Sequence, residues 1–328
     1  MNWLTGGNPA QKFLLMAFAI VLFVAVVGLI LFLVDRPKNP RKWVLALGFL
    51  GLPLLGLGVG LVYPAIDTIR NSFLNRDATQ FIGFDNYVTA FTTPEFLVVL
   101  RNTAIWVLCV PILATFIGLV YAVVVDRSRF EKFAKALIFL PMAISMVGAS
   151  IIWGFVYAFR PVQGTIQQIG LLNQVLVWLG IPPQQFLINQ PWNTLFLVVI
   201  LIWIQTGFAM TLLSAAIKAI PDDIVEAARL DGLHGIGMFR YITVPTIRPT
   251  LVVVLTTIAI TTLKVFDIVR TTTGGQFGTS VVANEFYRQS FVTLNTGLGA
   301  ALAVLLFVLV IPIIWYNIRQ LRLAEEVR

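Results

Sequence analysis

Residues 217–249 read IKAIPDDIVEAARLDGLHGIGMFRYITVPTIRP, and they separate two apolar stretches, 192–216 and 250–270. Pro221 suits the first turn of a helix, and the two aspartates after it complement the positive end of the helix dipole. Gly232 can adopt the left-handed conformation that ends a helix. We therefore predict a short surface helix that begins at Pro221 and ends just before Gly232, between two segments that cross a membrane.

The composition of the whole chain is that of a membrane protein. Of its 328 residues, 58% are hydrophobic and only 12% are charged, whereas a soluble domain has about 25% charged residues. A bilayer core about 30 Å thick needs about 20 apolar residues per helix. Seven charge-poor windows reach this length, which predicts an all-α, polytopic membrane helical bundle. The windows are 13–34, 43–66, 103–125, 136–159, 192–216, 250–270 and 297–318.

The basic residues predict an orientation. Fifteen of the 23 lysines and arginines lie in the connections 35–42, 126–135 and 217–249 and in the tail from residue 319, which alternate with connections that carry only seven. Basic connections stay in the cytoplasm, so we expect the N-terminus outside and the C-terminus inside. This distribution also accounts for the net charge of +8 without a nucleic-acid partner.

The first window, 13–34, has two interpretations. It could be a secretory signal peptide, but its apolar stretch exceeds the 7–15 residues of a typical signal core. No small-residue cleavage site follows it before Asp35 and Arg36. We therefore expect a retained helix.

The residue inventory excludes several kinds of site. A single cysteine, Cys109, and a single histidine, His234, leave neither a disulfide framework nor a multi-thiolate or imidazole metal site. The chain has no G-x-x-x-x-G-K-[ST] sequence for binding nucleotide phosphates. We expect no metal, no bound cofactor and no catalytic residue in this chain.

The predicted surface helix carries one acidic side chain beside two very small ones. Glu226 precedes Ala227 and Ala228, so another backbone could approach closely while the carboxylate remains available to an arginine. An amphipathic helix that lies on the lipid headgroups would also fit this pattern. The residues alone leave both interpretations open.

These residues resemble the EAA motif of binding-protein-dependent ABC importer permeases. Gly232 follows the Glu-Ala-Ala triplet after three residues, and Ile242 and Pro245 complete the motif, with Val244 where leucine is more usual. The resemblance implies a type I permease core of six helices after one N-terminal helix. It also implies that the surface helix docks in a groove of a cytoplasmic ATPase, where Glu226 pairs with a basic residue. The coupling residues so implied are Glu226, Ala227, Ala228, Asp231, Gly232, Ile242 and Pro245.

The resemblance also implies a location, partners and a division of the chain. We expect a multi-pass protein of the prokaryotic plasma (inner) membrane, in contact with lipid, that works with a second homologous permease and an extracellular or periplasmic sugar-binding protein. ATP and Mg would be bound by a separate ATPase dimer. The expected parts are an extra helix and linker (1–42), the permease domain (43–318) and a cytoplasmic tail (319–328).

Other segments resemble the carbohydrate permeases of the maltose MalF type. The stretch 81–87, FIGFDNY, is similar to their F-V-G-x-x-N-Y, and Asn102-Thr103, Leu140-Pro141 and Thr273-Gly274-Gly275 match further short motifs. Residues 263–269 and 275–279 look more like the α-glucoside branch, which implies import of an α-glucoside or another small oligosaccharide. Maltose-type permeases place two helices before the core, whereas we count one in this chain, which requires an exposed N-terminus. If the first window is re-entrant, that orientation of the N-terminus is wrong.

Five residues are candidates for contact with the solute. Alignment with maltose-type permeases places Trp203 and Gln205 in a substrate-facing stretch and Thr261 and Lys264 at polar positions that face the sugar. Lys264 and Asp267 lie three residues apart, so on one helix they would share a face and could pair. Packing would equally explain Trp203 and Gln205, and snorkelling to water would explain Lys264.

Two other function classes fit less well. A secondary transporter of small polar solutes, coupled to an ion gradient, would be expected to carry carboxylates in several spans, and here only Asp267 is available. A membrane-embedded enzyme would need a catalytic constellation, which one histidine and one thiol do not supply.

Overall fold

The structure is a computed structural model that describes most of the chain. The described stretches are residues 9–35, 42–125, 129–161 and 170–326. Within them the regular elements are helices, and the one strand-like pairing is an isolated bridge between Leu74 and Phe81. The chain divides into two compact units, residues 1–67 and 68–328.

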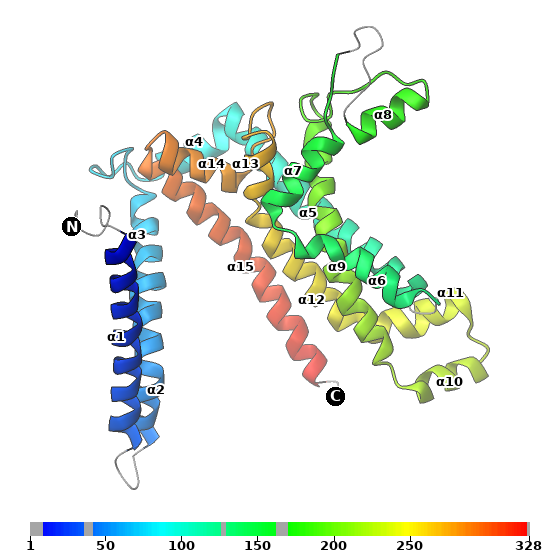
Figure 1. Ribbon diagram of the computed structural model, residues 1–328, viewed down its shortest axis with the longest axis horizontal. Coiled ribbons are helices and arrows are strands. Elements are labelled where there is room, and N and C mark those ends of the chain that lie inside the picture. The colour runs from blue at the N-terminus through cyan, green and yellow to red at the C-terminus, as the bar shows by residue number, and fades with distance from the viewer. Residues whose placement is uncertain (1–8, 36–41, 126–128, 162–169, 327–328) are drawn as a thin grey trace. The chain divides into compact units, whose positions relative to one another are not determined.

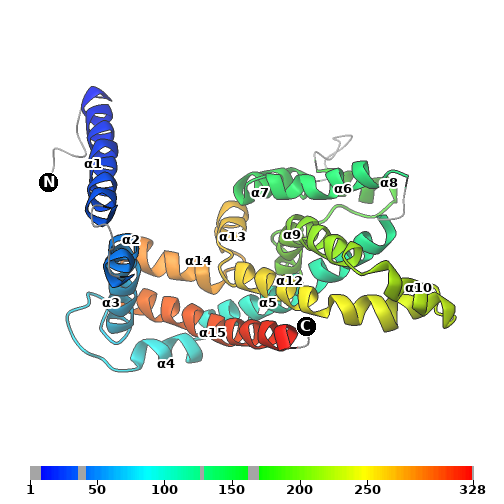
Figure 2. The ribbon, with the colours of Figure 1, turned by 90° about the horizontal axis from the view of Figure 1, so that it is seen from below.

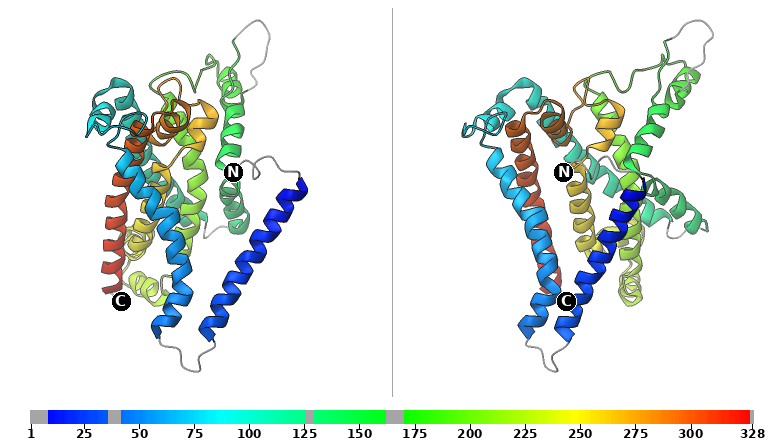
Figure 3. Two further views of the ribbon diagram at one scale, coloured as in Figure 1. Left: turned by 90° about the vertical axis from the view of Figure 1, so that its left-hand side faces the viewer. Right: turned by 60° about the vertical axis from the view of Figure 1, so that its left-hand side comes forward.

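The first unit is a pair of long helical segments. Helices α1 and α2 run in opposite directions and contact each other (Figure 1), and Figure 3 shows them diverging away from their connection. Helix α2 continues through a π-helical turn into α3, which extends past the end of the unit. The elements are α1 (Pro9–Asp35), α2 (Lys42–Leu57), η1 (Gly58–Val62) and α3 (Tyr63–Asn71). Most of the large apolar side chains described here are exposed, and none of them is buried, as a lipid-facing surface requires.

The second unit is built on four long helices, α5, α9, α12 and α15, with shorter helices at their ends (Figures 1 and 2). Its elements are α4 (Asp85–Thr92), α5 (Pro94–Val125), α6 (Glu131–Phe139), η2 (Leu140–Ala143), α7 (Met146–Val156), α8 (Leu171–Trp178), α9 (Asn193–Lys218), α10 (Asp222–Leu230), α11 (Gly235–Met238), η3 (Phe239–Thr243), α12 (Val244–Leu263), α13 (Asp267–Thr272), α14 (Val282–Tyr287), η4 (Arg288–Val292) and α15 (Thr296–Glu326).

The core of this unit lies where α5 crosses α9. A Cβ atom on Gly118 would lie 2.6 Å from that of Ala209, so the two backbones meet at small residues, as helices packed within a bilayer commonly do. Trp106 of α5 and Leu201 of α9 are fully buried, and α12 packs against both helices and against α15. This contact holds the helices that carry the candidate site residues.

The fourth predicted span, 136–159, is wrong as a single straight helix. Helix α6 and the turn η2 meet α7 at an angle of 105°. Pro141 lies in η2, and Ser145 begins a new helix because its hydroxyl accepts a hydrogen bond from the Gly148 amide at 3.0 Å. The average hydropathy of the segment is high throughout, so a hydropathy window gives no sign of the bend.

The sixth predicted span, 250–270, differs from the observed helical segment at both ends. A continuous helical segment begins at Gly235, ends at Leu263, and is followed by the separate helix α13. Among the described residues, five helices are long and apolar enough to cross a membrane, or six if the bent pair counts as one span. The apolar stretch found in α1, Lys12–Gly28, is shorter than these, so a seventh span stays a prediction.

Candidate functional site

The predicted surface helix exists as α10, one residue inside the expected limits at each end. Gly232 adopts the left-handed conformation, with φ of 82°, and the Leu233 amide donates to the Ala228 carbonyl at 2.9 Å. These features close the helix end as the sequence predicted.

The two faces of α10 differ in the way that a docking helix requires. Ala228 is buried and Val225 is half-buried against the core, whereas Glu226 and Ala227 are exposed. Glu226 forms no ion pair within the described part of the chain. The acidic and small side chains of the motif are therefore presented outward.

An ionic network fixes the helix that leads into α10. Glu131 at the start of α6 accepts hydrogen bonds from Lys218 at the end of α9 and, at 2.9 Å, from Lys135. Lys135 also donates to the Ser214 hydroxyl at 2.5 Å. After Lys218 the chain passes through the buried Ile220 into α10. The network therefore joins α6 to α9, the helix that leads into α10.

The rest of the motif lies outside α10. Asp231 and Gly232 are exposed at its end, whereas Ile242 is half-buried in η3 and Pro245 is exposed at the start of α12. Since η3 and α12 form one continuous helical segment, the second half of the motif belongs to a spanning helix.

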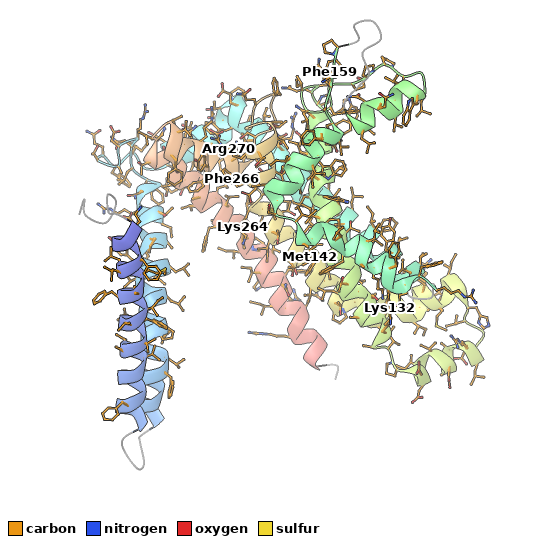
Figure 4. The ribbon with its side chains drawn as sticks, in the orientation of Figure 1. Lys132, Met142, Phe159, Lys264, Phe266 and Arg270 are labelled. Atoms are coloured by element: carbon orange, nitrogen blue, oxygen red, sulfur yellow. The ribbon has the colours of Figure 1, made fainter. Side chains whose placement is uncertain are left out.

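The predicted pairing of Lys264 with Asp267 is wrong. Helix α12 ends at Leu263, and Phe266, with φ of −130°, precedes the first residue of α13, Asp267. The two residues therefore do not share a helix face, and they form no ion pair. Figure 4 shows Lys264 at the end of α12, with Phe266 and Arg270 beyond it toward α13.

Trp203 and Gln205 lie on α9 but point to different sides of it. Two residues along a helix turn about 200° around its axis, and both side chains are half-buried. The Trp203 ring packs edge to face on Trp153, with 5.8 Å between ring centroids. Trp203 therefore belongs to an aromatic cluster with α7, as the packing interpretation proposed, and the structure does not bring it together with Gln205.

Thr261 is half-buried on the last full turn of α12. Its hydroxyl donates to the Thr257 carbonyl at 3.0 Å, which leaves the oxygen free to accept a hydrogen bond from a solute hydroxyl.

The loop 273–281 is held by side chains that sequence reasoning did not connect. The Asn102 amide of α5 donates to the carbonyls of Gly278 and Ser280 at 2.6 and 3.0 Å. Asn193 of α9 donates to the Phe277 carbonyl at 2.8 Å, and the Thr103 hydroxyl accepts from the Val282 amide at 2.9 Å. The signal available in the sequence for these contacts was the asparagine side chain at the start of each apolar span.

The turn in this loop requires glycine. Gly275 has φ of 83°, and a Cβ atom there would lie 2.3 Å from the Asn284 amide nitrogen. On helix α14, which follows the loop, the buried Glu285 accepts three hydrogen bonds from Arg288. These hydrogen bonds raise the pKa of the Arg288 guanidinium. The Thr-Gly-Gly motif is thus a packed structural turn.

Comparison with known proteins places the chain in a family. Residues 98–321, which run from α5 to α15, match the family described as binding-protein-dependent transport system inner membrane component. The chain belongs to this family. It is therefore a multi-pass inner-membrane subunit of a transport system and not an enzyme, and the ion-coupled alternative is discarded.

Relatives within the family transport solutes named in their descriptions. The chain is 46% identical over 275 residues to the osmoprotective compounds uptake permease protein GgtC of Synechocystis sp., covering 84% of this chain and 98% of that protein. It is 46% identical over 281 residues to the alpha-glucoside transport system permease protein AglF of Rhizobium meliloti, covering 85% and 82%. The trehalose/maltose permease protein MalF of Thermococcus litoralis is 31% identical over 269 residues, covering 79% and 88%.

The fold matches a solved importer. A bacterial ABC transporter that imports the polysaccharide alginate superposes with a TM-score of 0.73 at 22% sequence identity, covering 86% of this chain and 96% of that one. The expected all-α importer fold is confirmed.

Proposed function

We propose that this chain is the membrane-spanning subunit of an ATP-driven importer of a small α-glucoside or a related oligosaccharide. The support for the solute class is the 46% identity to an alpha-glucoside permease, together with the sequence resemblance to the α-glucoside branch at 263–269 and 275–279. The stretches 81–87 and 273–275 resemble carbohydrate permeases more generally. A second permease would form the other wall of the pathway, and an extracytoplasmic sugar-binding protein would deliver the solute. The C-terminus would be cytoplasmic.

The outward face of α10 carries the proposal for energy coupling. Glu226 is exposed beside Ala227 and forms no ion pair with any residue that the structure describes, so it can enter a groove of a separate ATPase and pair with a basic residue there. ATP and Mg bind that ATPase. Closure of the ATPase dimer would then move α10, and the network through Glu131 would pass the movement to α6 and α9.

The substrate pathway is proposed to include Gln205 and Thr261, whose polar groups suit sugar hydroxyls. Trp203 would support α9 through its contact with Trp153. Lys264 and Asp267 would act separately, at the break between α12 and α13, as polar groups along the same route.

The test of coupling is charge reversal at Glu226. Glu226→Lys should lower sugar uptake by the reconstituted complex at least about thirtyfold, the loss expected when one partner of a buried charge pair is replaced, while membrane insertion is unchanged. Asp77→Lys, a reversal at an exposed position of the loop after α3, should leave uptake unchanged. Restoration by an acidic substitution of the facing basic residue of the ATPase would identify the pair, and unchanged uptake in Glu226→Lys would contradict the proposal.

The solute class is tested with a panel of radiolabelled sugars. Vesicles with the complete complex should take up α-glucosides in preference to the matching β-glucosides, and vanadate should block uptake. Equal uptake of both anomers would remove the α-glucoside assignment without affecting the coupling result.

A further inference from the structure

A groove separates the second half of α5 from the segment that follows α10. Its volume is about 670 Å³, within the range of about 300–1,000 Å³ that is typical of sites for small ligands. One wall is the stretch of α5 from Phe116 to Val124, and the other is formed by residues 233–243. Ile217 and Arg229 complete the lining.

The length of the groove along α5 is close to the thickness of one leaflet of the bilayer core. Eight residues of helix separate Phe116 from Val124, a rise of about 12 Å, and half of a bilayer core is about 15 Å. Phe116 and Val124 are 62% and 65% exposed, so the groove opens sideways from a spanning helix. An apolar channel in this position fits an acyl chain.

The end of the groove near α10 is basic. Arg229 and His234 belong to the lining, which includes no aspartate or glutamate among the described residues. Arg229 lies in the last turn of α10 and forms no ion pair in the described part of the chain. A guanidinium in this position can bind a phosphate through two hydrogen bonds.

We propose that this groove binds an anionic phospholipid of the cytoplasmic leaflet. Its acyl chain lies along α5 between Phe116 and Val124, and its phosphate contacts Arg229. The headgroup of an anionic lipid, unlike that of phosphatidylcholine, has no cation that neutralises this phosphate. The proposal rests on the orientation assigned under the proposed function, because α10 must face the cytoplasm. It makes the helix that receives the ATPase a lipid-binding element as well, so the charge of the membrane would influence the position of α10.

The experiment uses the complete transporter complex in nanodiscs that contain phosphatidylglycerol or phosphatidylcholine with a photoactivatable group in the acyl chain. Labelled peptides are identified by mass spectrometry. We expect labels on 116–124 and 233–243, with about five times more from phosphatidylglycerol, the factor that one basic residue near an anionic lipid surface gives. Arg229→Gln should reduce labelling by phosphatidylglycerol to the level of phosphatidylcholine.

A matched control lies on the same segment. Arg240 is exposed, with its guanidinium 6.0 Å from the centre of the Tyr241 ring, and it does not line the groove. Arg240→Gln should leave the labelling unchanged. Val123→Trp, at an exposed lining position of α5, should abolish labelling by both lipids while the unfolding temperature is retained.

Three results would overturn the proposal. Equal labelling by both lipids that Arg229→Gln does not change would indicate an unspecific lipid belt. Loss of labelling in millimolar inorganic phosphate would indicate a site for the free anion. Absence of labels in the groove would mean that protein covers it. The assay needs no sugar, so a wrong solute assignment would not affect its outcome.

Discussion

Asn102 shows how a single buried amide can fix the end of the bundle that carries the loop 273–281. Its side chain is fully buried, and it donates to two carbonyls of the loop 273–281. Without it the carbonyls of Gly278 and Ser280 would lose their donor, at a cost of about 1–3 kcal/mol for each group left unpaired. We expect Asn102→Ala to lower the unfolding temperature of the purified complex and to make the loop more sensitive to protease.

Asn189→Ala is the control, because the Asn189 side chain is exposed and forms no hydrogen bond within the described part of the chain. This variant should unfold at the temperature of the unmodified protein. If Asn102→Ala behaves in the same way, the amide does not hold the loop.

Residue contacts of this kind are difficult to predict from sequence. Asn102 lies 176 residues before its partner Gly278, and no local pattern pairs positions so far apart. The error at Lys264 has a related origin, because a spacing of three predicts a shared face only while the helix continues. The helix that carries Glu226 was predictable because the signals for its start and end, Pro221 and Gly232, lie within one short segment. The coupling role of Glu226 stays a prediction.

At the scale of elements, hydropathy predicted where helices lie in the sequence better than where the chain bends. The windows 103–125 and 297–318 lie within α5 and α15, and the window 192–216 begins one residue before α9. A run of apolar residues thus predicts the position of a lipid-spanning helix. The bend between α6 and α7 depends on a proline and a capping serine inside an apolar run, which a composition window averages away.

The two alanines of α10 should respond differently to enlargement. Ala228 is 5% exposed, whereas Ala227 faces outward. Ala228→Leu should overpack the buried space around this side chain, at a cost of about 1–3 kcal/mol, and lower the unfolding temperature of the permease itself. Ala227→Leu should leave that temperature unchanged and weaken assembly with the ATPase.

Thermal unfolding and co-purification with the ATPase measure the two effects separately. Loss of assembly with normal stability in both variants would mean that α10 is not seated on the bundle through Ala228. Normal assembly in Ala227→Leu would mean that the ATPase does not approach this face.

At the scale of the whole molecule, the N-terminal helix is the part with least support from the family. The alignment with GgtC includes 98% of that protein but leaves 16% of this chain unmatched. The match to the family begins at residue 98. The six remaining predicted spans form an even number, so they keep both ends of the core on one side of the membrane. The core should therefore not need the first helix for its orientation.

Deletion of residues 1–34 tests this argument. The shortened chain keeps Arg36, Lys38, Arg41 and Lys42 before its first span, and this basic segment should hold the new N-terminus in the cytoplasm. A reporter fused to the C-terminus should still report a cytoplasmic location, and uptake should persist. Replacing the four basic residues by glutamine in the shortened chain should produce mixed orientations, because the charge difference across the first span is then removed. A C-terminus that moves outside after the deletion alone would show that the first helix sets the topology.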